Sequence, residues 1–396
     1  MLLYQVAKPF WGHHDFNNAF YGNMARNLVR FSILDTKLAQ VTSSGRPSVS
    51  DFSFHTHHPP LLIWALGVSY LLFGVTELST RLVPIAFSVG TLFTFYMLIK
   101  KTVNSKTAVI ASFFWIVTPL YIYFGKMAVQ EIPVLFFVLL GLYSYAAGKV
   151  KLLYFSTFLA ALSGWPGYYL IPTIWLWSLL RTGKIAKNIT ALPIVAIGVF
   201  AFHLFQNHVV TGSTIGGGFL NSFVLRSSDI PLFEYARKEL SWILAYFTKP
   251  FVTLAAGGLI ISLIHRKALI LVLFFFGILH LIFFRQAAFR HDYLIYYLLP
   301  AVSLGAALFL THMIRNKFFL TSTTLLIIAF SLSLSFRFTG ALQGSNYGRI
   351  AVQAGKNIAT KTSPNERVTL INKEIYNNFD WQVRFYADRN VTIIPE

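Results

Sequence analysis

Long apolar runs dominate the chain, and short loops that carry charge separate them. Several runs extend for about 17–20 residues without a charged residue, enough for a helix to cross a bilayer core of about 30 Å. The pattern predicts membrane-spanning helices at residues 81–99, 107–124, 131–147, 152–166, 167–181, 188–206, 245–264, 268–284, 293–314 and 318–336. We therefore expect an all-α polytopic membrane protein of about 10–12 transmembrane helices.

Basic residues in the loops orient these helices. Clusters of Lys and Arg occupy alternate loops, at residues 100–106, 149–151, 181–187, 266–267 and 315–317. Because cytoplasmic loops carry an excess of Lys and Arg, the loops between them are expected on the outer face of the membrane, with the long loop at 207–244 among them. Residues 59–73 are also apolar, but they are short and contain Gly and Ser. We interpret them as an interfacial or re-entrant helix, which leaves residues 1–58 outside as the first extracytoplasmic loop.

The last sixty residues differ in character from the rest of the chain. Charged residues are frequent from residue 337 to 396, an amphipathic pattern predicts a short helix at 350–360, and alternation predicts strands at 368–372 and 391–394. The sequence thus predicts a transmembrane domain over 1–336 and a small α/β appendage outside the membrane over 337–396.

Composition narrows the class of protein. Hydrophobic residues make up 55% of the chain and charged residues 12%, against about 25% charged in a soluble domain. This excludes a soluble enzyme, a disordered chain and a secreted disulfide scaffold. There is no Cys, so disulfides and thiolate chemistry are excluded. The net charge of +19 comes without a nucleic-acid-binding motif, so we expect anionic lipid rather than nucleic acid as the partner.

Carboxylates are scarce, which makes each one in the outer loops informative. Asp15 lies beside His13 and His14 in the aromatic, amide-rich stretch HHDFNNAFYGNMARN. Glu131 stands at the outer end of a predicted span. An acidic residue in the first turn of a helix is favourable through the helix dipole alone, so Glu131 has a structural interpretation as well as a functional one.

Two further outer clusters combine cationic and aromatic residues. His57 and His58 precede a diproline in FHTHHPPLLIW, where imidazoles suit a phosphate or a metal, although the spacing does not specify a metal site. Arg285, Arg290 and His291 lie in FFRQAAFRHDYLIYYLLP. Basic residues on the outer face oppose the general trend, which indicates an anionic partner such as a lipid phosphate, with a local Arg–Asp pair as the alternative. The charges of the long outer loop, Arg226 among them, fit a solvated helix.

The order of these motifs resembles that of the GT-C glycosyltransferases that use polyprenyl-phosphate sugars, which include protein O-mannosyltransferases and the lipid A aminoarabinose transferase. The resemblance runs through HHDFNNAFYGNMARN, HHPPLLIW, LFGVTELSTRLVPIAFS, KMAVQEIPVLFF, RHDYLIYYLLP and VRFYADRNVTIIP, and so covers nearly the whole chain. This chain differs from those relatives in two respects. Many relatives carry Asp-Glu in the first loop, where Phe16 follows Asp15 here. The family's first transmembrane helix is not recognisable in the short, polar stretch of residues 1–11.

The resemblance implies roles for individual residues. Asp15 corresponds to the first-loop carboxylate that acts as catalytic base or orients the acceptor, and Glu131 to a second acid near the sugar or acceptor. The expected contacts to the donor phosphate are His58, Arg81, Arg290 and Tyr293, with His57, Arg285 and His291 as additional candidates. No cofactor is required and no metal ligands are assigned, although a divalent metal stays open.

The resulting expectation is an inverting glycosyltransferase on the outer face of the cell membrane. It moves a hexosyl or pentosyl group from a polyprenyl-phosphate to the hydroxyl of a glycolipid, polysaccharide or protein. With Asp15 as the base, Asp15→Asn is expected to abolish turnover with little loss of folding. Two alternatives stay open. One is a transporter or flippase of a lipid-linked or anionic solute, since His203 and His280 lie within predicted spans. The other is a relative that binds polyprenyl-phosphate without catalysis.

Overall fold

The computed structural model describes residues 1–214, 217–227, 230–343, 346–373, 375 and 379–395. Most of them are helical. The first half of the chain forms α1 (Phe16–Arg30), α2 (Ile33–Thr36), η1 (Val49–Asp51), α3 (Leu61–Phe73), α4 (Glu77–Thr102), α5 (Ser105–Ile116), α6 (Pro119–Phe124), α7 (Glu131–Ala146), α8 (Val150–Ser163), η2 (Trp165–Tyr169), α9 (Leu170–Thr182), η3 (Lys187–Ile189) and α10 (Leu192–Thr211). The second half forms α11 (Gly217–Ser227), α12 (Leu232–Tyr246), α13 (Lys249–Ile264), α14 (Ala268–Phe283), α15 (Arg285–Arg290), η4 (Asp292–Leu298), α16 (Leu299–Met313), α17 (Lys317–Leu342), α18 (Asn346–Lys361), β1 (Arg367–Ile371), α20 (Asp380–Ala387) and β2 (Asn390–Ile394).

The described helices include several that can cross a membrane. Four are long and apolar enough, at Glu77–Thr102, Lys187–Thr211, Asp292–Met313 and Lys317–Leu342. The pair α12 and α13, bent by 107°, would make a fifth, and shorter apolar helices occupy several of the other predicted spans. Large apolar side chains such as Ile194 on α10 and Leu326 on α17 are more than 70% exposed, which suits surfaces that face lipid. The predicted all-α polytopic membrane fold is confirmed.

Prolines and glycines break spans that the apolar pattern alone predicts as continuous. The stretch at 107–124 forms two helices, α5 and α6, because Pro119 has no N–H to donate and disfavours the helical conformation at Thr118. Thr118 instead caps α6 by accepting from the backbone N–H of Tyr121 at 3.2 Å. The break that the sequence predicts between 152–166 and 167–181 comes slightly earlier: α8 ends at Ser163, and Gly164 leads into the short helix η2, which has Pro166 in its first turn.

Helix α3 occupies most of the apolar segment at 59–73. Its 13 residues extend for about 20 Å, which is shorter than a bilayer core of about 30 Å. Leu62, Ile63 and Leu66 of α3 pack with Met24 and Ala25 of α1 in one buried cluster. The segment is therefore packed against the first loop, and whether it crosses the membrane stays a prediction.

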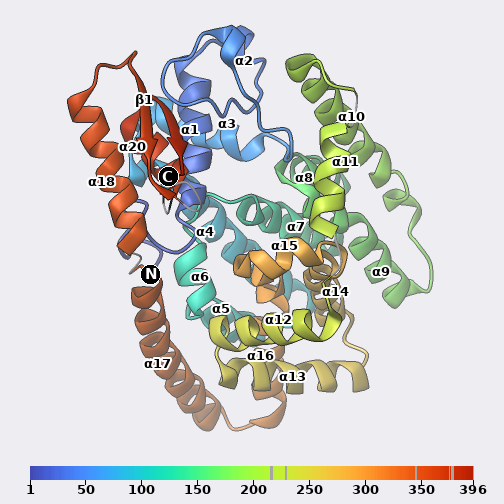
Figure 1. Cartoon of the computed structure of the whole chain (residues 1–396). Helices are drawn as coiled ribbons and strands as arrows, with labels where there is room; N and C mark the ends of the chain where they lie inside the picture. The colour runs from blue at the N-terminus through green and yellow to red at the C-terminus, as the bar shows by residue number, and fades with distance from the viewer. Residues whose placement is uncertain (215–216, 228–229, 344–345, 374, 376–378, 396) are drawn as a thin grey trace.

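The tail forms the small α/β appendage that its sequence predicts. Strands β1 and β2 pair in parallel, with Arg367 opposite Asn390 and Ile371 opposite Ile394. Helices α18 and α20 pack against each other, and α20 contacts α1. The tail thus lies beside the start of the chain (Figure 1). Helix α17 continues to Leu342, past the predicted beginning of the tail at residue 337.

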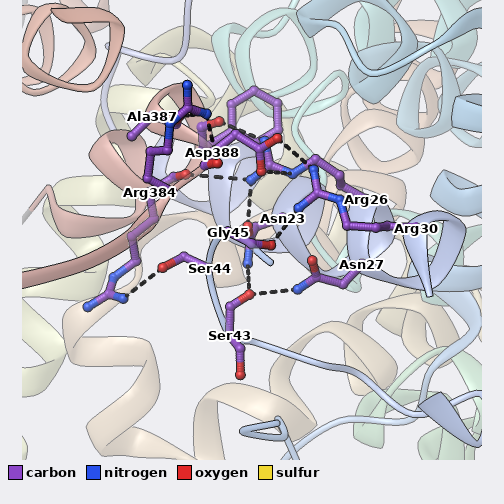
Figure 2. Close-up of polar contacts among 12 residues, drawn as sticks. Asn23, Arg26, Asn27, Arg30, Ser43, Ser44, Gly45, Arg384, Ala387 and Asp388 are labelled. Carbon is purple, nitrogen blue, oxygen red and sulfur yellow. Dashed lines mark hydrogen bonds and ion pairs between the residues drawn. The ribbon is translucent and has the colours of Figure 1, made fainter. Parts of the chain in front are cut away.

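A set of polar side chains, here called the tail clamp, joins α1 to the tail and to residues 41–43 of the first loop (Figure 2). It consists of Asn23, Arg26, Asn27, Arg30 and Asp388. Arg26 donates to the carbonyl of Phe385 on α20 at 2.8 Å and to Asn23 Oδ1 at 2.7 Å. Arg30 donates to Asp388 Oδ2 at 2.6 Å. The clamp holds the appendage and the first loop as one unit.

Candidate active site

A cavity of about 160 Å³, here called the polar cavity, lies where the first loop meets α7, α11 and η4. Its chemistry comes from segments that are far apart in the sequence. The titratable side chains in its wall are those of Tyr21, His55, His58, Glu131, Arg226, His280, His291 and Tyr293. The cavity therefore gathers imidazoles, one carboxylate, one guanidinium and two phenols around a small volume.

The structure brings together four of the residues that the sequence predicts for the site. His58, Glu131, His291 and Tyr293 all line the polar cavity. The other five predicted residues are not among those that line it. Asp15 and Arg81 pair with each other, and the rest lie near the cavity: His57 in the first loop, and Arg285 and Arg290 on α15.

The histidine loop is held through its backbone, which leaves its imidazoles to face the cavity. The carbonyl of Thr56 accepts from Asn207 at 3.0 Å and from the imidazole of His203 at 3.1 Å. The carbonyl of His57 accepts from the indole of Trp165 at 2.6 Å, and that of His58 accepts from the side-chain amide of Gln40. The loop is thus positioned by groups from η2, α10 and the first loop, while the His58 side chain makes no hydrogen bond with any described residue.

Two contacts with α1 set the position of Glu131 at the start of α7. Asn18 Oδ1 accepts from the backbone N–H of Ala128 at 2.8 Å. Tyr21 donates to the side chain of Gln130 at 2.8 Å. Because both contacts fall within three residues of Glu131, its carboxylate is directed by the fold of the first loop. Glu131 itself is 8% exposed.

Several buried polar atoms in the wall of the cavity have no hydrogen-bond partner among the described residues. They are Glu131 Oε2, His55 Nε2, His58 Nδ1 and His291 Nδ1. Leaving a buried polar group unpaired costs about 1–3 kcal/mol, and native proteins rarely do so without a reason. Several such atoms around one cavity indicate a site built for a polar ligand.

Arg226 supplies the positive charge of this site. Burial lowers the pKa of His55 and of His58 well below the usual range, and the charge of Arg226 acts in the same direction. Burial also lowers the pKa of His291 to about 4, with His14 and Arg226 adding to the effect. At neutral pH the cavity therefore presents neutral imidazoles and one permanent cation.

Arg226 is a residue of the candidate site that the sequence does not reveal. The expectation of a solvated helix is wrong for this side chain, because α11 folds over the cavity and Arg226 lines it. The signal that singles out Arg285 and Arg290, a basic residue on the outer face, applies equally to Arg226. The sequence does not distinguish Arg226 from its neighbours, because the acidic and basic residues around it are typical of a solvated helix.

Asp15 lies in a different environment from Glu131. Its carboxylate accepts from the backbone N–H of Gly12 and from Asn18, both at 2.8 Å. Arg81 approaches both carboxylate oxygens of Asp15 at 3.4 Å. It also donates to the backbone carbonyls of Val6 and Lys8. Asp15 is 6% exposed and Arg81 is 2% exposed. This buried pair anchors the beginning of the chain to α4.

An apolar groove adjoins the polar cavity. It has a volume of about 380 Å³ and is lined by aromatic and aliphatic side chains of η2, α9, α10 and α11, and by Phe284 between α14 and α15. Trp165 belongs to the walls of both the groove and the cavity. A molecule with a long apolar chain and an anionic head could therefore place each part in a matching environment.

Comparison with known proteins agrees with this geometry. A family model described as dolichyl-phosphate-mannose-protein mannosyltransferase matches residues 57–206, which include His58, Arg81 and Glu131. The structure of ArnT from Cupriavidus metallidurans bound to undecaprenyl phosphate superposes with a TM-score of 0.74 at 15% identity, over 99% of this chain and 83% of that chain. AglB, an oligosaccharyltransferase from Archaeoglobus fulgidus in complex with an inhibitory peptide and a dolichol-phosphate, superposes with a TM-score of 0.61 at 14% identity, over 97% of this chain and 61% of that chain.

Curated relatives match a smaller part of the chain. Two proteins of Aquifex aeolicus, both described as uncharacterized, are 26% identical over 178 residues and 28% identical over 123 residues. The matches cover 42% and 30% of this chain, and 34% and 29% of the relatives, so they span about a third of the relatives' length. The chain shares the fold of ArnT and AglB, and the resemblance to the GT-C glycosyltransferases that the motifs predict is confirmed.

Proposed function

We propose that this chain transfers a sugar from a polyprenyl-phosphate to an acceptor hydroxyl on the outer face of the membrane. One observation carries the proposal: a polar cavity with unpaired buried groups and one guanidinium meets an apolar groove at Trp165. The groove suits the prenyl chain, and the cavity suits the phosphate and the sugar. The likeness to a structure that holds undecaprenyl phosphate supports the same donor class.

The reaction is a single displacement that inverts the anomeric carbon. The acceptor oxygen forms a bond to that carbon, and the bond between the carbon and the phosphate oxygen breaks. The phosphate leaves with the electron pair, and the hydroxyl proton passes to a carboxylate. Arg226, His58 and Tyr293 border the space in which the phosphate would develop charge, and fixed groups of this kind stabilise a leaving anion. Arg285 and Arg290 flank Ala287 of the cavity wall and stay candidates for the same phosphate.

Glu131 is the better placed base of the two predicted carboxylates. It lines the cavity, and its Oε2 atom has no hydrogen-bond partner among the described residues. Asp15 is already engaged by a backbone N–H, Asn18 and Arg81. We therefore assign proton acceptance to Glu131 and a positioning role in the first loop to Asp15.

Lipid binding to the purified protein tests the donor class. Undecaprenyl phosphate is expected to bind, and uncharged undecaprenol is expected to bind at least about 10-fold more weakly, a difference of about 1.4 kcal/mol. Arg226→Gln should remove that preference. Arg315→Gln, a matched change at an exposed residue between α16 and α17, should leave it intact. Equal affinity of the wild type for the two lipids would overturn the proposal.

A transfer assay separates catalysis from binding alone. Membranes that contain the protein are incubated with radiolabelled polyprenyl-phosphate sugars, and the release of polyprenyl-phosphate is followed. Binding without release under all donors tried would identify a non-catalytic relative. The transport alternative gains no support from His203, since its imidazole donates to the Thr56 carbonyl and so holds the histidine loop.

A further inference from the structure

Two consecutive histidines of the first loop face one carboxylate of the loop that follows α15. His13 Nε2 lies 2.7 Å from Asp292 Oδ2, and His14 Nε2 lies 3.1 Å from Asp292 Oδ1. Their potential ligand atoms all lie within 4.8 Å of one another. Among the described residues, no other group of three His or acidic side chains meets this condition. The sequence assigns none of the three to a site.

The backbone of the first loop is shaped to aim both imidazoles at the same point. The His13 N–H donates to the carbonyl of Leu342, and its carbonyl accepts from the Tyr123 hydroxyl, both at 2.8 Å. His14 has a φ of +56°, in the left-handed region that few residues other than Gly adopt. In an extended chain, neighbouring side chains point to opposite faces. The left-handed turn instead brings the two rings to 4.1 Å from each other.

The carboxylate in this cluster is buried and only partly satisfied. Asp292 is 5% exposed. Its Oδ2 is hydrogen-bonded to both the Tyr246 hydroxyl and His13 Nε2, whereas Oδ1 has no hydrogen bond of good geometry among the described residues. A buried carboxylate costs several kcal/mol unless a positive charge offsets it. A cation between the three side chains would do so.

We propose that His13, His14 and Asp292 bind a divalent metal ion, and that Zn²⁺ fits them best. Two imidazole nitrogens and one carboxylate oxygen, with a fourth position left open, form a common Zn²⁺ ligand set with bonds of about 2.0–2.2 Å. Mg²⁺ and Ca²⁺ prefer oxygen ligands throughout. The His13 side chain is 40% exposed, so solvent reaches the fourth position. Tyr246 holds the carboxylate from behind, as outer partners of metal ligands do.

The ion would lie at the edge of the polar cavity. Asp292 stands between His291 and Tyr293, which both line that cavity, and the ring of His14 is 5.2 Å from that of Tyr293. The ion would thus join the first loop to the cavity wall. Metal binding does not depend on the proposed function, whereas a contribution of the ion's charge to phosphate binding rests on it.

Direct metal binding tests the proposal. The full chain is purified without a polyhistidine tag and stripped with a chelator, and Zn²⁺ affinity is measured by competition with a chromogenic indicator. We expect one tight Zn²⁺ per chain, and a Co²⁺ adduct with the absorption of a tetrahedral site. His13→Gln and Asp292→Asn should each weaken Zn²⁺ binding about 10-fold or more. Mg²⁺ should not compete.

Two choices keep the result interpretable. His13→Gln replaces a half-buried side chain with one that can still donate to Asp292, so it should fold even if Asp292→Asn does not. The double variant His265→Gln/His312→Gln removes a different pair of neighbouring imidazoles, whose rings lie 5.4 Å apart, and should bind Zn²⁺ as the wild type does. Zn²⁺ affinity that is unchanged in His13→Gln, or absent in the wild type, would refute the site whatever the transfer assay shows.

Discussion

The tail clamp and the polar cavity both bury polar side chains where α1 and the first loop meet another part of the chain. In the clamp the charged side chains pair with one another: Arg26, Arg30 and Asp388 form ion pairs at 2.6–3.3 Å (Figure 2), although Asn27 Oδ1 has no hydrogen-bond partner among the described residues. In the cavity, buried atoms of His58 and Glu131 have none among the described residues. The two regions are neighbours, because helix α1 contributes side chains to both of them.

This difference separates a structural role from a binding role. Hydrogen bonds to charged groups contribute about 1.5–3 kcal/mol when both partners are present, so the clamp stabilises the folded chain. Unpaired buried groups destabilise it until a ligand satisfies them. The cavity should therefore respond to ligand and activity measurements, and the clamp to stability measurements. Each prediction below tests one side of this distinction.

The largest effect is expected from Glu131→Gln. The amide keeps the shape of the carboxylate but cannot accept the acceptor proton, so sugar transfer should fall roughly 10²–10⁴-fold. Stability should be unchanged or higher, because the change removes an unpaired buried carboxylate. Turnover of a polyprenyl-phosphate sugar and thermal unfolding of the same preparation measure both. More than about a tenth of wild-type turnover would contradict the assignment of Glu131 as the base.

Asp15→Asn is expected to lower the stability of the folded chain. The sequence predicts lost turnover with intact folding, whereas the ion pair with Arg81 at 3.4 Å implies a loss of stability as well. Leaving a buried guanidinium without its partner costs about 3 kcal/mol. Denaturant unfolding of Asp15→Asn, Arg81→Gln and the double variant measures the coupling between them. A fully stable but inactive Asp15→Asn would instead restore Asp15 as the base.

The sequence predicts much of the fold because a membrane leaves few solutions for an apolar run. The span predicted at 131–147 is α7 at Glu131–Ala146, and the one at 268–284 is α14 at Ala268–Phe283. Errors fall at breaks such as the one before Pro119. There the apolar pattern continues, but the backbone cannot.

The site is less predictable because it depends on contacts between distant segments. His58 and Glu131 stand in recognisable motifs, so the sequence locates them. Arg226 is missed because its role depends on how α11 folds over the cavity. The contact of Asp15 with Arg81 joins residues 66 positions apart, and no local pattern distinguishes a buried pair from a solvated one.

Arg26→Gln should weaken the clamp without affecting the cavity. Its charged hydrogen bonds to α20 and its ion pair with Asp388 are lost, and we expect a destabilisation of about 2 kcal/mol. Limited proteolysis of the tail and thermal unfolding report the change. Arg46→Gln, the same substitution at an exposed position of the first loop, is the matched control. Loss of undecaprenyl phosphate binding by molecules that remain folded would show that the two regions are not separate.

The smallest effect is a pH dependence that arises from the cavity histidines. Burial lowers the pKa of His58 and His55, and Arg226 lowers it further, with His57 and His203 also facing them. The unfolded chain has a His pKa of about 6.5 and takes up protons below it, while the folded chain does not. The stability due to neutral histidines is therefore complete above about pH 6.5 and declines as the pH falls below it.

Replacing Arg226 by Gln removes one cause of the low pKa values, so the variant should lose less stability in acid. The difference in thermal stability between Arg226→Gln and the wild type should move in favour of the variant by a few tenths of a kcal/mol per histidine as the pH falls below about 5, where the folded histidines begin to take up protons. Arg226→Lys keeps the charge and should follow the wild type. A difference that does not vary with pH would mean that Arg226 does not act on these imidazoles, and its place as the cation of the cavity would have to be reconsidered.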